Sequence, residues 1–300
     1  MLFHTNTKTG IDQYSAHPLT LAPDLRQVFE MTEAHRSEAL QFLAIRPVHT
    51  VVMTSFINDN GIESSLNRGR FFGYRNTKGT LEGIALIGHT TLVEARTDEA
   101  LKAFAFEARN SRTPVHLIMS SGQDAEEFWR WFGDGLHEPR LSCTELLFEV
   151  SFPYLVQPCE WDIRLATMDE LEAVAQAQAA IAFMESGVDP MLTDRKGFLE
   201  RTARRISQQR VFVVFENGTM VFKADIIAET SDVIYLEGIY VAPEYRGRGV
   251  GSNCLGGMTL ELLKRAQNVC LLSNISFIEA HLSYLKAGYK NTDSCTTLFV

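Results

Sequence analysis

Several features that would mark a membrane, secreted or metal-binding protein are missing from the sequence. No apolar run reaches the ~18 residues of a transmembrane helix, and no basic region followed by a long apolar run opens the chain. The five cysteines are an odd number without a Cys-x-x-Cys pair, which argues against a disulfide framework and a structural zinc site. We therefore expect a cytoplasmic protein that needs no metal and spans no membrane.

Clusters of basic residues are also missing. The chain has 28 Lys and Arg residues against 37 Asp and Glu residues, which gives a formal net charge of −9. Because nucleic acids and anionic membranes are bound through concentrated positive charge, we expect neither as a partner. The acidic balance suits a cationic substrate such as an amine, although many acidic proteins bind nothing cationic.

The length and composition are those of two ordinary globular domains. The chain has 300 residues, of which 45% are hydrophobic, and domains of about 150 residues are common. Residues 1–20 are polar and aperiodic and are predicted to form a flexible tail. Pro153 and Pro158 mark a junction, which predicts one domain over residues 21–152 and a second over residues 153–300.

Apolar spacing predicts alternating helices and strands in both halves. In the first half we expect helices over 24–44, 47–58, 98–108 and 125–132, and strands over 71–74, 81–90, 115–119 and 146–150. In the second half, behind a Thr167–Glu170 capping box, we expect helices from 171 and over 194–208, 250–266 and 277–287, and strands over 211–215, 220–228, 233–241 and 269–272. The two patterns echo each other. The predicted fold class is α/β, with a mixed sheet flanked by helices in each of two related domains.

A glycine-rich loop joins the strand over 233–241 to the helix that begins near residue 250. In Arg246-Gly247-Arg248-Gly249-Val250-Gly251 the glycines allow backbone conformations that a Cβ forbids, so that successive N–H groups can converge on one anion. The N-terminus of the helix and the two arginines add positive charge. No Gly-Lys-Ser/Thr ends the loop, and its third glycine comes too early for a dinucleotide fingerprint. A plain connecting turn is the alternative, but the strand and helix context favours a phosphate or diphosphate site.

The segment Arg246-x-x-Gly249-x-Gly251 resembles the acetyl-CoA pyrophosphate loop of the GNAT N-acetyltransferase superfamily. The run Tyr284-Leu285-Lys286-Ala287-Gly288-Tyr289 is similar to a second signature of that family, and the match covers about residues 160–300. The whole chain resembles bacterial tandem-GNAT proteins with a degenerate N-terminal copy. This resemblance implies two GNAT-like domains in tandem, the second of which binds acetyl-CoA as co-substrate.

The resemblance also implies where acetyl-CoA binds. Its pantetheine arm would occupy a gap where the strand over 233–241 splays from the strand over 269–272, and Gly238 would permit a bulge that helps the splay. The cofactor-binding residues implied are Ile239, Tyr240, Val241, Arg246, Gly247, Arg248, Gly249, Val250, Gly251, Ser252 and Asn274. Asn274 carries an alternative, because it can instead cap the following helix. Family members often have Asn where this chain has Phe277, which is a departure from the family's pattern.

Glu237 and Tyr284 are the predicted catalytic residues. An amine with a pKa of about 10.4 is only about 0.1% neutral near pH 7, so a base must take its proton before it attacks a thioester. Glu237 shares a strand face with Ile239 and Val241, and apolar neighbours would raise its pKa toward a useful range. The resemblance places Tyr284 at the family's acid position, where it would protonate the leaving thiolate. The plainer alternatives are an ion-paired glutamate and a packed aromatic ring.

The expected activity is transfer of an acetyl group from acetyl-CoA to a small-molecule or peptide amine. A non-catalytic acyl-CoA-binding regulator and an aminoacyl transferase of the tandem-GNAT type are the alternatives, and a homodimer stays open. Glu185, Asp189 and Asp194 are expected to attract the cationic acceptor. The first half lacks the loop and has Trp129 in the position of Tyr284, so we expect it to shape the acceptor pocket rather than to catalyse.

Overall fold

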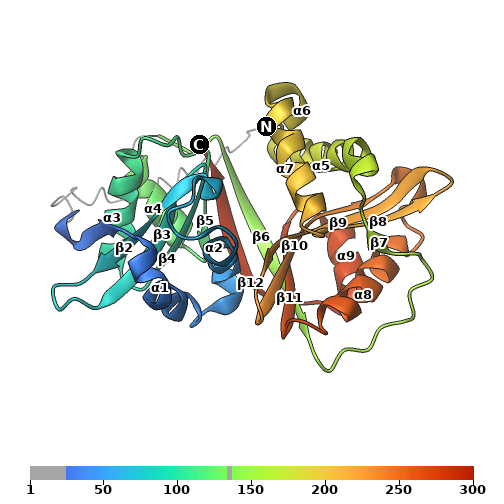
Figure 1. Cartoon of the computed structure of the whole chain (residues 1–300), viewed down its shortest axis with the longest axis horizontal. Coiled ribbons are helices and arrows are strands. Elements are labelled where there is room, and N and C mark those ends of the chain that lie inside the picture. Colours follow the sequence, from blue (N-terminus) through green and yellow to red (C-terminus); the bar gives the residue numbers. More distant parts are fainter. Residues whose placement is uncertain (1–24, 134–136) are drawn as a thin grey trace, which may run out of the picture.

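The computed structural model describes residues 25–133 and 137–300, and the tail predicted over residues 1–20 lies outside them. Helices and strands follow one another in nearly the same order in the two halves of the described chain. The strands build one continuous mixed sheet, and helices lie on both of its faces (Figure 1). The predicted fold class is therefore confirmed.

The first half contains six strands and four α-helices within the described residues. They are β1 (Val28–Glu30), α1 (Arg36–Leu43), α2 (Pro47–Asn60), β2 (Gly69–Arg75), β3 (Leu81–Gly88), β4 (Thr90–Ala95), α3 (Asp98–Arg109), β5 (Leu117–Ser121), α4 (Asp124–Phe132) and β6 (Leu141–Ser151). The helix predicted over 24–44 is wrong at its start, because β1 pairs antiparallel with β2, with Val28 opposite Tyr74. Strand pairing outweighs the helical spacing of its apolar residues.

The second half repeats this order with one additional short helix. Its elements are β7 (Arg164–Leu165), α5 (Leu171–Ser186), α6 (Pro190–Thr193), α7 (Arg195–Ser207), β8 (Val211–Glu216), β9 (Thr219–Glu229), β10 (Val233–Val241), α8 (Val250–Leu262), β11 (Asn268–Asn274), α9 (Ile278–Lys286) and β12 (Lys290–Phe299). The capping box ahead of α5 is present, with both of its reciprocal hydrogen bonds. The sequence patterns did not predict β4 or β12.

The two halves exchange their last strands. The sheet order is β1-β2-β3-β4-β5-β12-β6-β11-β10-β9-β8-β7, so the last strand of the chain pairs with β5 of the first half, and β6 pairs with β11 of the second half. β6 and β12 pair with each other at the centre of the sheet (Figure 1). The halves are therefore joined through the sheet itself as well as through the linker that follows β6.

Successive residues of β10 face opposite sides of the sheet, as the strand period requires. Leu236 packs in the apolar cluster that contains Met258 of α8, whereas Tyr235 packs with Val51 of α2. Helices α5 and α7 cover β8 and β9 on the side of Tyr235. The side of β10 that carries Tyr235 and Glu237 therefore lies next to helices from both halves.

Candidate functional site

The loop between β10 and α8 has the backbone that the glycine pattern predicts. Gly247 and Gly249 have φ values of 72° and 80°, in the region that residues with a Cβ rarely adopt. A Cβ on Gly251 would lie 3.1 Å from Cγ2 of Val241 at the end of β10. Gly249 is the N-cap of α8, and the first turn of this helix carries no acidic residue. The unpaired N–H groups of that turn are therefore available to an anion.

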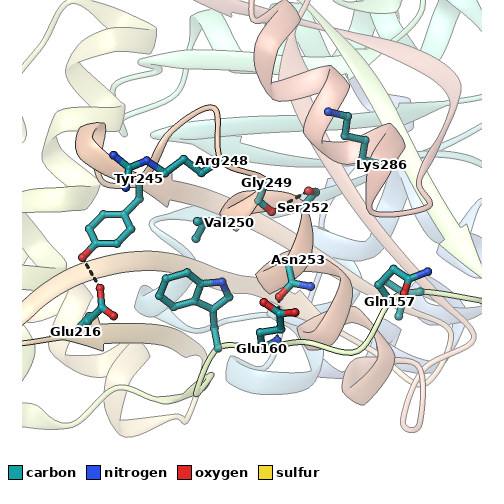
Figure 2. A pocket seen from close by; sticks show the side chains of 12 residues that line it. Gln157, Glu160, Glu216, Tyr245, Arg248, Gly249, Val250, Ser252, Asn253 and Lys286 are labelled. Carbon is teal, nitrogen blue, oxygen red and sulfur yellow. Dashed lines mark hydrogen bonds between the residues drawn. The ribbon is translucent and has the colours of Figure 1, made fainter.

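A cavity of about 590 Å³ opens in front of this helix end (Figure 2). Four of the predicted cofactor residues line it: Arg248, Gly249, Val250 and Ser252. The remaining lining residues are Val156, Gln157, Glu160, Trp161, Glu216, Tyr245, Asn253 and Lys286. The cavity thus combines one arginine, one lysine and two glutamates with the start of α8, and the hydroxyl of Tyr245 donates to one of these glutamates, Glu216. The positive groups at the start of α8 suit a diphosphate.

One wall of this cavity comes from the linker between the halves. Asn253 of α8 holds the linker, because its side chain accepts from the N–H of Glu160 at 3.0 Å and donates to the carbonyl of Pro158 at 3.1 Å. The Trp161 ring packs edge-on against Tyr245, with 6.0 Å between centroids. Sequence reasoning missed this wall, since Pro158 indicated only a junction and local spacing carries no signal for docking of a linker.

Two other predicted residues stabilise the loop itself. Nε of Arg246 donates to the carbonyl of Val241 at 2.9 Å, which ties the loop to the end of β10. The Ser252 hydroxyl donates to the carbonyl of Gly249 at 3.0 Å. Of the two loop arginines, it is Arg248 that lines the cavity, so Arg248 is the candidate for direct contact with a diphosphate.

The expected gap between β10 and β11 is present. The parallel pairing begins with Val233 opposite Asn268 and ends with Leu236 opposite Leu271. Beyond that point β10 remains paired only with β9, and a register shift separates Glu237 from Tyr240. Gly238 lies in this bulge with a φ of 62°. The edges of β10 and β11 are therefore apart over residues 239–241, where the pantetheine arm is expected.

Glu237 lies where β10 leaves β11. The Tyr235 hydroxyl donates to Oε1 of Glu237 at 2.7 Å. Burial raises the pKa of Glu237, and the neighbouring Asp225 adds to the rise. The hydrogen bond from Tyr235 and the positive charges of Arg205 and Lys223 act in the opposite direction. The expectation that Glu237 shares a strand face with Ile239 and Val241 is wrong, because the bulge turns Ile239 and Val241 to the side of Leu236. The raised pKa of Glu237 and its place at the end of the gap still fit the role of a general base.

Two further carboxylates influence Glu237. Burial raises the pKa of Glu145, which belongs to the exchanged strand β6, and the charge of Glu237 adds to this rise. Part of the Glu185 side chain in α5 is exposed to solvent. The surrounding protein nevertheless raises the pKa of its carboxyl group to about 8, mainly by removing water from it and to a lesser extent through the charges of Glu237 and Glu145. The Thr297 hydroxyl of β12 donates to Glu145. Sequence reasoning missed Glu145, because only the strand exchange brings it to this site.

The other two acidic residues expected at the acceptor site have structural roles. Asp189 caps α6 by accepting from the N–H of Met191 at 2.8 Å. Asp194 caps α7 by accepting from the N–H of Gly197 at 3.1 Å, and it forms an ion pair with Arg201 at 3.1 Å. Both residues therefore cap helices, which the residue type alone also explains, and their attraction of the acceptor stays a prediction.

Tyr284 is 8% exposed and packs edge-on against Phe148 of β6, with 5.4 Å between ring centroids. Burial raises its pKa to about 12, so the phenol keeps its proton at neutral pH. Asn274 does not cap α9, because the N-cap of α9 is Phe277. Its Oδ1 accepts from the N–H and the hydroxyl of Ser276 at 2.9 and 2.7 Å, and its contact with the cofactor stays a prediction. The side chain of Asn274 therefore shapes the turn before α9.

The first half has different contacts at the corresponding places. Thr97 caps α3 by accepting from the N–H of Ala100 at 3.3 Å, and Asp98 and Glu99 occupy the first turn. Trp129 donates through Nε1 to the carbonyl of residue 137 at 2.7 Å and packs at the edge of the apolar core. An acidic first turn repels a diphosphate, so the start of α3 is unsuited to coenzyme A.

Two searches of the described residues concern metals and membranes. Within residues 25–133 and 137–300 there is no group of three or more His, Cys, Asp or Glu side chains that could hold a metal ion. Among the helices of the same residues, none is both long and apolar enough to cross a membrane.

Comparisons with known proteins agree with this geometry. Residues 207–291 match the family model of the acetyltransferase (GNAT) domain, and a sequence search of curated proteins finds no match. An acetyltransferase of the GNAT family from Colwellia psychrerythraea is 12% identical, with a TM-score of 0.55 over 91% of this chain and 99% of that one. A Drosophila protein is 12% identical, with a TM-score of 0.62 over 91% and 98% of the two chains.

A tandem GNAT protein from the clavulanic acid biosynthesis pathway is also similar. It is 11% identical to this chain, with a TM-score of 0.57 over 91% of this chain and 97% of that one. Identities this low establish similarity of fold, and they do so over nearly the full length of both chains. Residues 207–291 thus match the acetyltransferase (GNAT) domain model, and the whole chain is similar in fold to solved GNAT proteins, a tandem GNAT protein among them.

Proposed function

We propose that the chain transfers an acetyl group from acetyl-CoA to a primary amine, and that the second half carries out the reaction. The observation that carries the proposal is the combination of a helix start suited to an anion with a protonatable carboxylate on β10, the strand that precedes this helix. The loop glycines and Arg248 would hold a diphosphate, and Glu237 lies where the gap beside β10 begins. These residues fit coenzyme A, because the first turn of α8 has no acidic side chain to oppose it.

The reaction requires three proton movements. Bound acetyl-CoA supplies an activated thioester. Glu237 takes one proton from the acceptor ammonium, directly or through water, and the freed nitrogen lone pair attacks the acyl carbon as the carbon–sulfur bond breaks. Tyr284 gives its proton to the departing sulfur, which needs only modest help because a thiol has a pKa of about 8.5. The second proton of the nitrogen then passes to the Tyr284 phenolate, which leaves a neutral amide and restores the phenol, and Glu237 releases its proton to solvent. The raised pKa of Glu237 and the intact phenol of Tyr284 suit these roles.

The first half contributes the acceptor side of the site in this proposal. Its exchanged strand β6 supplies Glu145 next to Glu237, and Phe148 of the same strand supports Tyr284. Arg140, just before β6, donates to the carbonyl of Ser186 at the end of α5 at 3.1 Å. We therefore expect the acceptor amine to enter between α5 and the first half, past carboxyl groups from both.

A screen for thiol release tests the proposal. The purified chain is incubated with acetyl-CoA and a library of primary amines, polyamines and lysine- or N-terminal amine peptides, and free coenzyme A is measured. We expect release that depends on a particular amine and an acetylated product with one acetyl group on nitrogen. Tight binding of acetyl-CoA without release for any amine would contradict the proposal and favour a non-catalytic acyl-CoA-binding regulator.

A further inference from the structure

Lys223 of β9 is a buried cation beside the bulge of β10. Its side chain is 0% exposed, and its Nζ donates to Oε1 of Gln178 in α5 at 2.7 Å and to the carbonyl of Gly238 at 3.2 Å. Nζ also lies 2.7 Å from Oδ1 of Asp225. The ammonium therefore joins α5, β9 and the bulge, which are the elements around the predicted reaction centre (Figure 1).

A buried ammonium is costly unless it is paired and hydrogen-bonded. Burial lowers the pKa of Lys223, and the carboxylate of Asp225 opposes that change. Asp225 is itself held from the other side, because its Oδ2 pairs with Nη1 of Arg205 in α7 at 2.5 Å. The network is complete around Lys223, yet an apolar side chain of the same length would fill this space without its desolvation cost. We therefore expect the charge of Lys223 to have a role other than packing in the core.

The contact with the bulge provides that role. The register shift removes Gly238 from the ladder with β9, so its carbonyl needs another donor, and Lys223 is that donor. The approach is close: a Cβ on Gly238 would lie 2.3 Å from Oε1 of Gln178 and 2.7 Å from Nζ of Lys223. The φ of 62° favours glycine, and a Cβ would also displace the ends of both side chains. The ammonium fixes the direction of the carbonyl of Gly238, immediately after Glu237.

We propose that Lys223 is a positioning residue for acetyl transfer, which holds the β10 bulge away from β11 through the carbonyl of Gly238 and places a positive charge beside Glu237. The inference rests on the proposed function of the same site. The inference gives Lys223 two separate roles. Its hydrogen bond keeps the gap for the pantetheine arm, and its charge favours the ionised form of the base.

Several other charged and titratable groups face Glu237 and also influence its protonation. They are Tyr235 on its own strand, Asp225 on β9, Arg205 on α7, Glu185 on α5 and Glu145 on β6. Arg205 is the cation among them, and its side chain is partly exposed whereas that of Lys223 is not. Removal of the Lys223 charge therefore raises the proton affinity of Glu237, since a nearby opposite charge favours the carboxylate.

The test is the variant Lys223→Met, which keeps the length of the side chain and leaves Asp225 paired with Arg205. We expect acetyl-CoA to bind about tenfold more weakly by calorimetry, because a hydrogen bond from a charged group is lost. We expect the acidic limb of the kcat profile to move to higher pH by about one unit. Lys264→Met removes an exposed lysine of the ion pair with Glu261 and is the matched control, with wild-type values expected.

Two further outcomes keep the inference open to rejection. If Lys223→Met does not fold, Gln178→Met tests the same contact, and we expect a smaller loss of acetyl-CoA affinity in the same direction. Wild-type affinity together with an unmoved acidic limb in a folded variant would overturn the inference. If the wild-type chain acetylates no amine, the proposed function fails, but the comparison of acetyl-CoA affinities still decides whether Lys223 holds the gap.

Discussion

The helices α3 and α8 occupy the same place in the two halves, yet only α8 begins in a way that suits an anion. Residues 242–249 separate β10 from α8 and include two glycines with positive φ, whereas only Arg96 and Thr97 separate β4 from α3. The start of α3 is closed by the Thr97 cap and carries two acidic residues, and the start of α8 has neither. A repeated fold therefore keeps its packing while one copy loses the features that bind a diphosphate.

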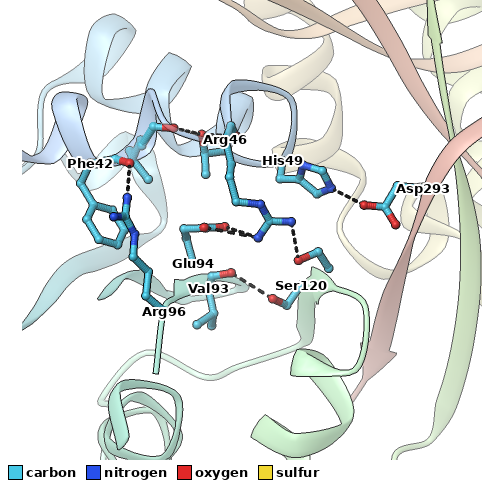
Figure 3. A network of polar contacts seen from close by, with 11 residues as sticks. Phe42, Arg46, His49, Val93, Glu94, Arg96, Ser120 and Asp293 are labelled. Carbon is cyan, nitrogen blue, oxygen red and sulfur yellow. Dashed lines mark hydrogen bonds and ion pairs between the residues drawn. The ribbon is translucent and has the colours of Figure 1, made fainter. Parts of the chain in front are cut away.

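The two halves also differ in the partners of a buried carboxylate, which is Glu94 in β4 and Glu237 in β10. Glu94 of β4 is 6% exposed and pairs with Arg46 at 3.1 Å, and Arg46 also donates to Ser121 at 3.1 Å (Figure 3). Glu237 of β10 accepts instead from a neutral phenol, that of Tyr235. Burial raises the pKa of both carboxylates, and nearby positive charge opposes that rise in both. The direct partner is what differs, because an ion pair with Arg46 occupies Glu94 whereas a neutral phenol contacts Glu237. We therefore expect Glu94 to serve stability and Glu237 to serve the proposed chemistry.

The largest expected effect comes from exchanging these carboxylates for amides. We expect Glu237→Gln to lower kcat by about 10²–10⁴-fold, because a general base is lost, with little change in acetyl-CoA affinity. Glu94→Gln should keep the wild-type rate and lose only about 1 kcal/mol of stability, since the ion pair becomes a weaker hydrogen bond. Steady-state kinetics and urea unfolding of both variants provide the measurement. A wild-type rate in Glu237→Gln would remove Glu237 from the mechanism.

A smaller effect is expected when α8 is given the acidic start of α3. Ser252→Asp places a carboxylate in the first turn of α8, and we expect acetyl-CoA to bind about tenfold more weakly through repulsion of the diphosphate. Ser252→Asn has nearly the same shape without the charge and should lose much less affinity. Calorimetry at low and high salt separates the two, because the charge effect weakens with salt. Equal losses in both variants would mean that shape, and not charge, decides.

The smallest effect concerns pH. Glu185 has a folded-state pKa raised to about 8 by the protein around it and the charges of Glu237 and Glu145, so the folded state binds a proton that the unfolded state releases near its ordinary value. This contribution to stability is present at low pH and is lost as pH rises toward 8. We expect Glu185→Gln to flatten the fall in unfolding free energy between pH 5 and about 8.5.

Glu38 of the first half is the matched control for that measurement. The hydrogen bonds from Arg75 lower the pKa of Glu38, so its contribution is present above the ordinary pKa and is lost as pH falls through the folded value. Glu38→Gln should therefore change the pH dependence only in the acidic range. A wild-type slope between pH 5 and 8.5 in Glu185→Gln would show that Glu185 titrates normally.

The features that the sequence predicted correctly are those that depend on neighbours along the chain. The glycine loop, the capping box and the bulge at Gly238 follow from local backbone preferences, and the structure contains all three. The strand β12 was missed although Thr296, Thr297 and Phe299 are residues typical of strands. Its partners lie far away in the sequence, and local spacing does not show which strand a segment joins.

The candidate site was predictable only in part, for the same reason. The order of residues indicated the start of α8 and Glu237, but Glu145 reaches the site through the strand exchange and Trp161 through docking of the linker. Asp189 and Asp194 were expected at the acceptor and are helix caps. Their spacing from the following helices was the available signal, since Asp is a favoured N-cap residue.

A crystal structure with bound coenzyme A tests the central comparison most directly. The account predicts the diphosphate at the start of α8, within hydrogen-bond distance of the N–H groups of Val250, Gly251 or Ser252 and next to Arg248, with the thiol in the gap beside Glu237. No coenzyme A is expected at the start of α3. A diphosphate bound anywhere else, with the first turn of α8 left open to solvent, would contradict the account.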